Sequence, residues 1–180
     1  RGFRRDLDDR QQGDKRLHSG PASDQMIRDA IQAAAKRHDL DPAIVYGICI
    51  QESGLNPLAV RYEPHYRWLV RDRRLKPANC SDATEQTLQR MSLGLMQVMG
   101  AVIREQGFRG WLTECLGDDP EEIKLQLEIG CRHLAKGIQR WGLEEGIAAY
   151  NAGSPRRGAD GKLVNQAYVD GVMEKARGWA

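Results

Sequence analysis

One glutamate stands in a setting that favours proton transfer. Glu52 follows the apolar run 43–50 and precedes Gly54, and glycine often ends a helix in the left-handed conformation. We therefore expect its carboxyl group near a helix C-terminus among apolar neighbours, where burial and the helix dipole both disfavour the charged form. A carboxylic acid that stays protonated near neutral pH can serve as a general acid. The alternative is an ordinary surface glutamate at a frayed helix end.

Two further segments combine small residues with hydrogen-bonding side chains. Gly94 lets the backbone approach a neighbour closely, and Gln97 is a polar residue inside an apolar run. Tyr150 and Asn151 lie in a run of small residues that permits close packing. Taken alone, Gln97 is more typical of a partly exposed helix residue than of a ligand contact.

The four cysteines give no metal-binding pattern. Cys49, Cys80, Cys115 and Cys131 form no CxxC pair, so a zinc site is not expected. Cys49 lies in an apolar helix and is expected to be a buried thiol. Cys80 could form a disulfide with Cys115 or Cys131, and the sequence leaves that choice open.

Length and charge exclude several function classes. The 180 residues suit one domain, or one domain with a tail. A net charge of +2 with both signs mixed is not the basic field of a nucleic-acid-binding protein. No apolar run reaches membrane-spanning length. The chain starts at Arg1 without a signal peptide, as expected of a processed protein or an excised domain. We expect a flexible charged arm over 1–22 and a folded domain over 23–180.

Helical signals dominate the folded part. Ser23 or Asp24 can cap a first helix that ends by Asp39, and Asp41-Pro42 opens the helix that carries Glu52. Asp119-Pro120 opens a long helix. Its expected buried stripe comprises Ile123, Leu127, Cys131, Leu134, Ile138 and Trp141. His133 lies off this stripe and is expected to be exposed.

The remaining elements are shorter. We expect an element from Ser92 to about Gln106, a short helix over 144–150, and a last helix over 165–178 with Tyr168, Val169 and Val172 on its core side. The fold is thus predicted to be all-α, with a small hairpin or a long loop in 58–90. In that segment, Tyr66 and Trp68 either line a sugar groove, because aromatic rings stack on pyranoses, or pin a loop to the core.

Four motifs in order resemble the soluble lytic transglycosylase (SLT) domain of the lysozyme-like superfamily, a relative of goose-type lysozymes. They are ESGLNP at 52–57, GLMQ at 94–97, AYNAG at 149–153 and YV at 168–169. The resemblance covers about residues 25–175. It implies an all-α lysozyme-like fold with a peptidoglycan-binding groove, and cleavage of the β-1,4 bond between N-acetylmuramic acid and N-acetylglucosamine.

The resemblance also implies roles for six residues. Glu52 would be the single acid/base that forms 1,6-anhydromuramoyl ends, assisted by the substrate's own acetamido group. This mechanism would require no metal or cofactor. The other five would bind substrate: Ser53 would orient the reacting centre, Met96 and Gln97 would line the groove, Tyr150 would hydrogen-bond Glu52 or its neighbourhood, and Asn151 would contact the sugar.

One departure leaves alternatives open. The segment 58–90 makes the spacing between Glu52 and Gln97 longer than is common in this family, and it adds Glu63 and Asp72. Either carboxylate could hold a water and make the enzyme a muramidase. A non-catalytic wall-binding domain is a third reading.

The expected setting follows from the substrate. A peptidoglycan-cleaving enzyme acts in the periplasm, outside the cell, or after delivery by a phage. The arm 1–22 and the segment 58–90 are candidate contacts for a partner protein.

Overall fold

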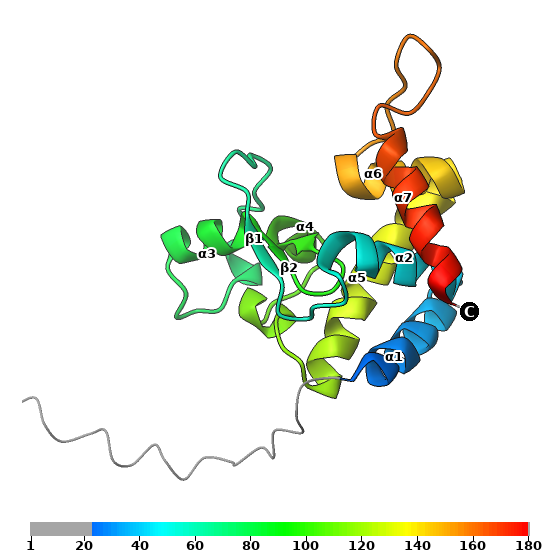
Figure 1. The fold of residues 1–180 in the computed structure, drawn as a ribbon. Coiled ribbons are helices and arrows are strands. Elements are labelled where there is room, and N and C mark those ends of the chain that lie inside the picture. Colours follow the sequence, from blue (N-terminus) through cyan, green and yellow to red (C-terminus); the bar gives the residue numbers. More distant parts are fainter. Residues whose placement is uncertain (1–22, 180) are drawn as a thin grey trace, which may run out of the picture.

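The computed structural model describes residues 23–179, so the predicted arm 1–22 lies outside the described residues. Figure 1 shows a group of helices, here called the helical lobe, beside a smaller sheet lobe formed by residues 58–116. The helical lobe comprises α1 (Asp24–Arg37), α2 (Pro42–Ser53), α5 (Pro120–Trp141), α6 (Leu143–Ala152) and α7 (Gln166–Ala176), followed by the short 3-10 helix η3 (Arg177–Trp179). The all-α class predicted from the sequence is confirmed, with one small sheet beside the helices.

The sheet lobe is built on three short antiparallel strands in the order β1-β2-β3. Val60 pairs with Leu93, and Ser92 pairs with Met99. Its elements are β1 (Val60–Tyr62), η1 (Arg73–Leu75), α3 (Asp82–Gln89), β2 (Met91–Leu93), β3 (Val98–Met99), α4 (Gly100–Glu105) and η2 (Leu112–Cys115).

One sequence-based expectation about this lobe needs correction. Residues 58–90 contain β1, a long loop, η1 and α3, so the long-loop alternative is confirmed, while the strand β2 that pairs with β1 lies outside that segment. The element expected from Ser92 to Gln106 is a hairpin followed by a helix, because the turn around Gly94 reverses the chain before Gly100. Short strands carry too few residues to show an alternating pattern.

The predicted helix ends are confirmed by their caps. The Asp41 side chain accepts from the Ala43 N–H at 2.8 Å, with Pro42 at the first helical position of α2. The Asp119 side chain caps α5 in the same way. Gly54 ends α2 with φ +62°, the left-handed conformation expected of it. These caps fix Glu52 in the last turn of α2.

The core lies around α2 and α5. Helix α2 packs against α1 and α7 and faces the rest of the core. Its residues 43–50 are therefore apolar on every side of the helix. On α5, which packs against α1 and α6, the stripe from Ile123 to Leu134 is fully buried as predicted. Ile138 and Trp141, at the end of that stripe, are partly exposed.

A buried ion pair organises the sheet lobe. Arg104 of α4 is 1% exposed and donates to both carboxylate oxygens of Glu85 in α3, at 2.8 and 3.1 Å. Its remaining N–H groups donate to the carbonyls of Phe108 and Gly110. Because every partner is satisfied, this charge is compatible with burial, and it joins α3, α4 and the 108–110 turn.

All four cysteines are buried free thiols, so the disulfide between Cys80 and Cys115 or Cys131 is not formed. The cysteines sit in different elements: Cys49 in α2, Cys80 before α3, Cys115 in η2 and Cys131 in α5. Burial raises the pKa of Cys115 and of Cys131 to about 12.

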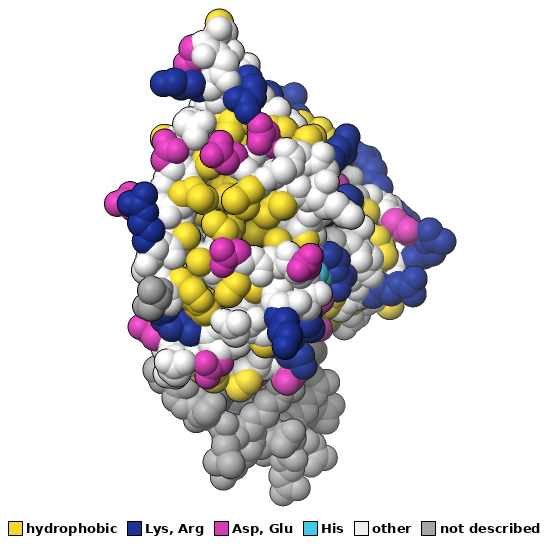
Figure 2. All heavy atoms as spheres, turned by 90° about the vertical axis from the view of Figure 1, so that its right-hand side faces the viewer, with side chains coloured by type: hydrophobic (Ala, Val, Ile, Leu, Met, Phe, Trp, Pro, Cys, Tyr) yellow, Lys and Arg dark blue, Asp and Glu magenta, His cyan; other side chains and the backbone are white. Residues whose placement is uncertain are grey.

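The surface of the helical lobe is mixed. Figure 2 shows hydrophobic side chains gathered on one face, with acidic and basic side chains around them. Exposed hydrophobic residues of this lobe include Leu143, Val164 and Met173. Within residues 23–179, no helix has the length and apolar character needed to cross a membrane.

Candidate active site

A cleft of about 760 Å³ lies between the two lobes. One wall comes from the sheet lobe, and the other comes from α2, α5, α6 and the start of the loop after α6 (Figure 1). The sheet lobe contributes Arg61, Glu63, His65, Tyr66, Trp68, Ser92, Gln97, Val98, Met99, Val102 and Glu105. The helical lobe contributes Glu52, His133, Tyr150, Asn151, Ala152, Gly153 and Ser154.

Glu52 lies half-buried in this cleft at the end of α2. The Tyr168 hydroxyl of α7 donates to Glu52 Oε1 at 2.6 Å. Burial raises the pKa of Glu52, while the Tyr168 hydrogen bond and the Arg61 charge lower it in part. Burial is the largest of the three effects, so the protonated acid persists to higher pH than in an exposed glutamate.

The turn 94–97 is held beside the end of α2 by hydrogen bonds with Gln126, Ser53 and Ala59. The Leu95 N–H donates to Oε1 of Gln126 in α5 at 2.9 Å, and the Leu95 carbonyl accepts from the Ser53 hydroxyl at 2.8 Å. The Gly94 N–H donates to the carbonyl of Ala59 at 2.9 Å. Gly94 has φ +71°, and a Cβ there would lie 2.3 Å from Gln126 Oε1, so glycine is needed for this approach.

Gln97 and Tyr150 complete this arrangement. Gln97 adopts a left-handed φ of +48°, and its amide nitrogen donates to the carbonyls of Ala59 and Gly94 at 2.9 and 3.0 Å. The hydroxyl of Tyr150 in α6 donates to the carbonyl of Met96 at 2.6 Å. Asn151 is exposed in the cleft, and its side-chain oxygen Oδ1 accepts from the side-chain amide of Asn165 at 3.0 Å.

The sequence that forms this cleft matches a family model, the transglycosylase SLT domain, over residues 29–168. The chain belongs to the transglycosylase SLT domain family. The comparison with curated proteins gives no match. Membership of the SLT family supports an enzyme of the lytic transglycosylase type that acts on the glycan strands of peptidoglycan in the cell wall.

Two of the predicted site residues of this SLT domain do not face the cleft as expected. Met96 was predicted to line the groove, but it is 1% exposed because its side chain packs against α5 at Gly130. A Cβ on Gly130 would lie 2.3 Å from the Met96 sulfur. The Ser53 hydroxyl is engaged with the backbone, donating to Leu95 and lying 3.0 Å from the Cys49 carbonyl. Both residues therefore hold the turn 94–97 in place without lining the cleft.

Three cleft features were missed by sequence reasoning. Tyr168 was assigned to the core side of its helix, yet its hydroxyl reaches Glu52; its place in the YV motif was the available signal. His133 was expected to be exposed, but it is half-buried against the Tyr150 ring at 5.2 Å between centroids. Burial lowers its pKa. Glu105 lines the cleft and carried no sequence signal.

The two candidate second carboxylates occupy different places. Glu63 lines the cleft and is ion-paired with Arg61 at 2.5 Å. Asp72 lines a separate hollow of about 200 Å³ on the sheet lobe and is ion-paired with Arg74, which holds the pKa of Asp72 at about 2. Among residues 23–179, no three His, Cys, Asp or Glu side chains are grouped as a metal site would require.

Proposed function

We propose that this SLT domain is a lytic transglycosylase in which Glu52 alone serves as acid and then as base. It cleaves the β-1,4 bond between N-acetylmuramic acid and N-acetylglucosamine and leaves a 1,6-anhydromuramoyl end. The observation that carries this proposal is the half-buried Glu52 carboxyl group, which lies in the interlobe cleft, has a raised pKa and accepts a hydrogen bond from Tyr168.

In the first step, protonated Glu52 donates its proton to the glycosidic oxygen as the bond to the muramoyl C1 breaks. The carbonyl oxygen of the substrate's 2-acetamido group bonds to C1 and stabilises the positive charge there. In the second step, the Glu52 carboxylate removes the proton of the C6 hydroxyl, whose oxygen attacks C1 and displaces the acetamido oxygen. The proton that left Glu52 is thereby replaced.

Tyr168 suits both steps. Because its hydroxyl occupies Oε1 of Glu52, Oε2 is left for proton transfer to the substrate. The same hydrogen bond stabilises the carboxylate that exists between the two steps. Tyr168 thus offsets part of the effect of burial on the Glu52 pKa, which favours a group that can both donate and accept a proton.

The other predicted site residues take positioning or binding roles. Gln97, Tyr150 and Asn151 line the cleft and are proposed to contact the sugars next to the scissile bond. Ser53 and Met96, which support the turn 94–97, are proposed to act through Gln97 and not by touching the substrate.

A muramidase is the second candidate, because two further carboxylates, Glu63 and Glu105, line the same cleft. A carboxylate across the cleft from Glu52 could activate a water, and water would then attack C1 in place of the C6 hydroxyl. Of these two, Glu63 is ion-paired with Arg61 of the same wall. Asp72 has no part in this alternative, since it lies in the other hollow.

Mass spectrometry of the soluble products from purified peptidoglycan tests the proposal. Products lighter by one water than reducing muropeptides, and their loss in Glu52→Gln, would support the transglycosylase. Reducing muropeptides that disappear in Glu63→Gln or Glu105→Gln would support the muramidase. Binding without products would favour a non-catalytic wall-binding domain.

The proposed place of action is the cell wall outside the cytoplasmic membrane. The segments 1–22 and 58–90 are the proposed contacts for a partner protein.

A further inference from the structure

The loop 63–70 on the sheet lobe is fastened to its scaffold on both sides of Trp68. The Glu63 N–H donates to the Arg90 carbonyl at 2.8 Å, and Arg90 Nε donates to the Tyr66 carbonyl at 3.3 Å. Further along, the side-chain amide of Gln89 accepts from the Val70 N–H at 2.8 Å and donates to the Val70 carbonyl at 2.9 Å. The loop is therefore held in place although it carries little buried surface.

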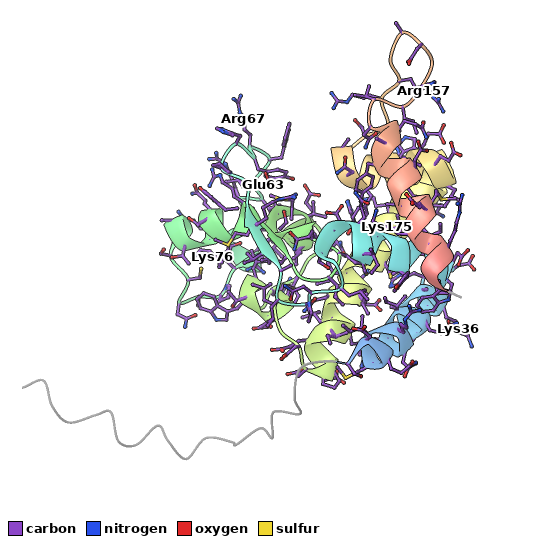
Figure 3. All side chains as sticks on the ribbon, in the orientation of Figure 1. Lys36, Glu63, Arg67, Lys76, Arg157 and Lys175 are labelled. Carbon is purple, nitrogen blue, oxygen red and sulfur yellow. The ribbon has the colours of Figure 1, made fainter. Side chains whose placement is uncertain are left out.

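Trp68 is 72% exposed, the highest value among the exposed large hydrophobic side chains of the described chain. It lines the same cleft as Glu52. Tyr66 lies beside it, edge to face, with 5.4 Å between the ring centroids. Figure 3 shows Glu63 and Arg67 of this loop on one side of the molecule and Arg157 of the loop after α6 on the other. Trp68 thus belongs to the sheet-lobe wall of the cleft, with most of its ring open to solvent.

An exposed indole on a fastened loop favours a ligand with a flat apolar surface. Covering it would remove apolar area from water, and a rigid aromatic side chain loses little conformational freedom on binding. The C–H face of a pyranose ring has this character. A loop that only needed to be pinned to the core would bury its tryptophan, and Trp68 is not buried.

We propose that Trp68, braced by Tyr66, forms a glycan-stacking subsite that holds a sugar of the strand away from the scissile bond. This proposal rests on the proposed function, because the glycan that occupies the Glu52 cleft is the occupant. The subsite lies in the segment 58–90 and lengthens the contact with the strand. A sugar held there, away from the reacting bond, would be bound equally in the ground state and in the transition state.

The test uses Glu52→Gln as the background, so that binding is measured without cleavage. Soluble peptidoglycan glycans of two lengths, a disaccharide and an octasaccharide, are titrated by calorimetry. Trp68→Ala is expected to weaken octasaccharide binding roughly tenfold, the value of one aromatic stack, and to leave disaccharide binding unchanged. Trp68→Phe, which keeps a ring, is expected to lose less than Trp68→Ala.

Tryptophan fluorescence gives a second readout. The sequence has four tryptophans, Trp68, Trp111, Trp141 and Trp179, and of these Trp68 lines the cleft. Octasaccharide is expected to change the emission of the background protein and of Trp141→Phe, the control, but not of Trp68→Phe. In the cleaving enzyme, Trp68→Ala is expected to raise KM with kcat unchanged.

The outcomes separate the two proposals. Octasaccharide binding that is unaffected by Trp68→Ala, with Trp68 emission unchanged, would overturn the subsite and leave the proposed function intact. Absence of any glycan binding by the Glu52→Gln protein would overturn both. Equal losses for the disaccharide and the octasaccharide would place Trp68 next to the scissile bond, and would overturn the distal position.

Discussion

The Tyr168 hydroxyl donates a hydrogen bond of 2.6 Å to Glu52 Oε1 across 116 positions of sequence. The bond joins α7 to the last turn of α2, two helices that pack against each other. It favours the charged carboxylate, whereas burial favours the neutral acid, and burial is the larger effect. Helix α7 therefore helps to set the pH range in which Glu52 can give up and regain a proton.

Removing this hydrogen bond should shift the pH profile. In Tyr168→Phe, the Glu52 pKa rises further, so the acid stays protonated to higher pH and the alkaline limb of kcat/KM moves upward. The carboxylate formed between the two steps is less stabilised, and kcat falls about 10- to 100-fold, the value of a hydrogen bond to a charged group. Rates of glycan cleavage measured against pH check both effects. An unchanged alkaline limb would remove Tyr168 from the acid/base system.

Tyr150→Phe is the matched control, since its hydroxyl reaches the Met96 carbonyl instead of Glu52. This variant leaves a buried carbonyl without that donor, and we expect a loss of about 1–3 kcal/mol in unfolding free energy. The rate should fall as the turn 94–97 loosens, but the alkaline limb should stay in place. Urea unfolding and the same pH series measure the two quantities. A shifted limb would link Tyr150 to Glu52 directly.

Glu52 should also leave a signature in stability. Its folded pKa is raised above the ordinary value of 4.5, so the folded state binds the proton more tightly than the unfolded state does. The resulting stabilisation is complete below the unfolded pKa and is lost as pH rises through the folded pKa. Glu52→Gln should therefore be more stable than the wild type near pH 7, and this advantage should shrink as the pH is lowered towards and below 4.5. Thermal unfolding of both proteins at several pH values measures this difference. If Glu52→Gln were less stable than the wild type at pH 7, the raised pKa of Glu52 would be contradicted.

Gly94→Ala tests the approach of the turn to α5. The new Cβ would lie 2.3 Å from Gln126 Oε1 and 3.0 Å from the Cys115 carbonyl, at φ +71°. Gly107→Ala is the control, because Gly107 also has a positive φ but no atom within 4 Å of its Cβ position. Both should lose about 1–2 kcal/mol to backbone strain. Gly94→Ala should lose about 1–3 kcal/mol more and should also lose activity. Equal stability losses would show that the turn can move aside.

The Arg104–Glu85 pair should respond non-additively. Arg104→Met leaves a buried carboxylate unpaired and should cost about 3–5 kcal/mol of unfolding free energy. The double variant with Glu85→Leu should cost less than the sum of the two single variants, since neither charge then remains buried alone. Denaturant unfolding of the four proteins completes the cycle. Strict additivity would mean that the two side chains do not depend on each other.

The helices could be predicted because the residues that begin and end them are recognisable from their neighbours in the sequence. Asp41-Pro42, Asp119-Pro120 and Gly54 mark boundaries that depend on neighbours in sequence. The apolar stripe of α5 likewise needs no distant contact to be recognised. Glu52 could be placed among apolar neighbours for the same reason.

The remaining features depend on partners far along the chain. Met96 is buried because Gly130 lets its side chain fit against α5, and His133 is half-buried because Tyr150 covers it. Tyr168 has the same periodic position as a core residue, and its reach to Glu52 depends on how α7 lies on α2. Strands β2 and β3 pair across the turn at Gly94, and β1 joins β2 from far along the chain, which no local sequence pattern indicates.

The four buried thiols have a consequence for where the fold can exist. Within the described chain, no disulfide holds its elements together, and no cysteine is exposed for one to form with another molecule. The covalent structure of this domain is therefore the same in a reducing compartment, where proteins are made, and in an oxidising one, where cell walls are found. The domain needs no oxidation step to become folded, and none to remain so when it reaches its substrate.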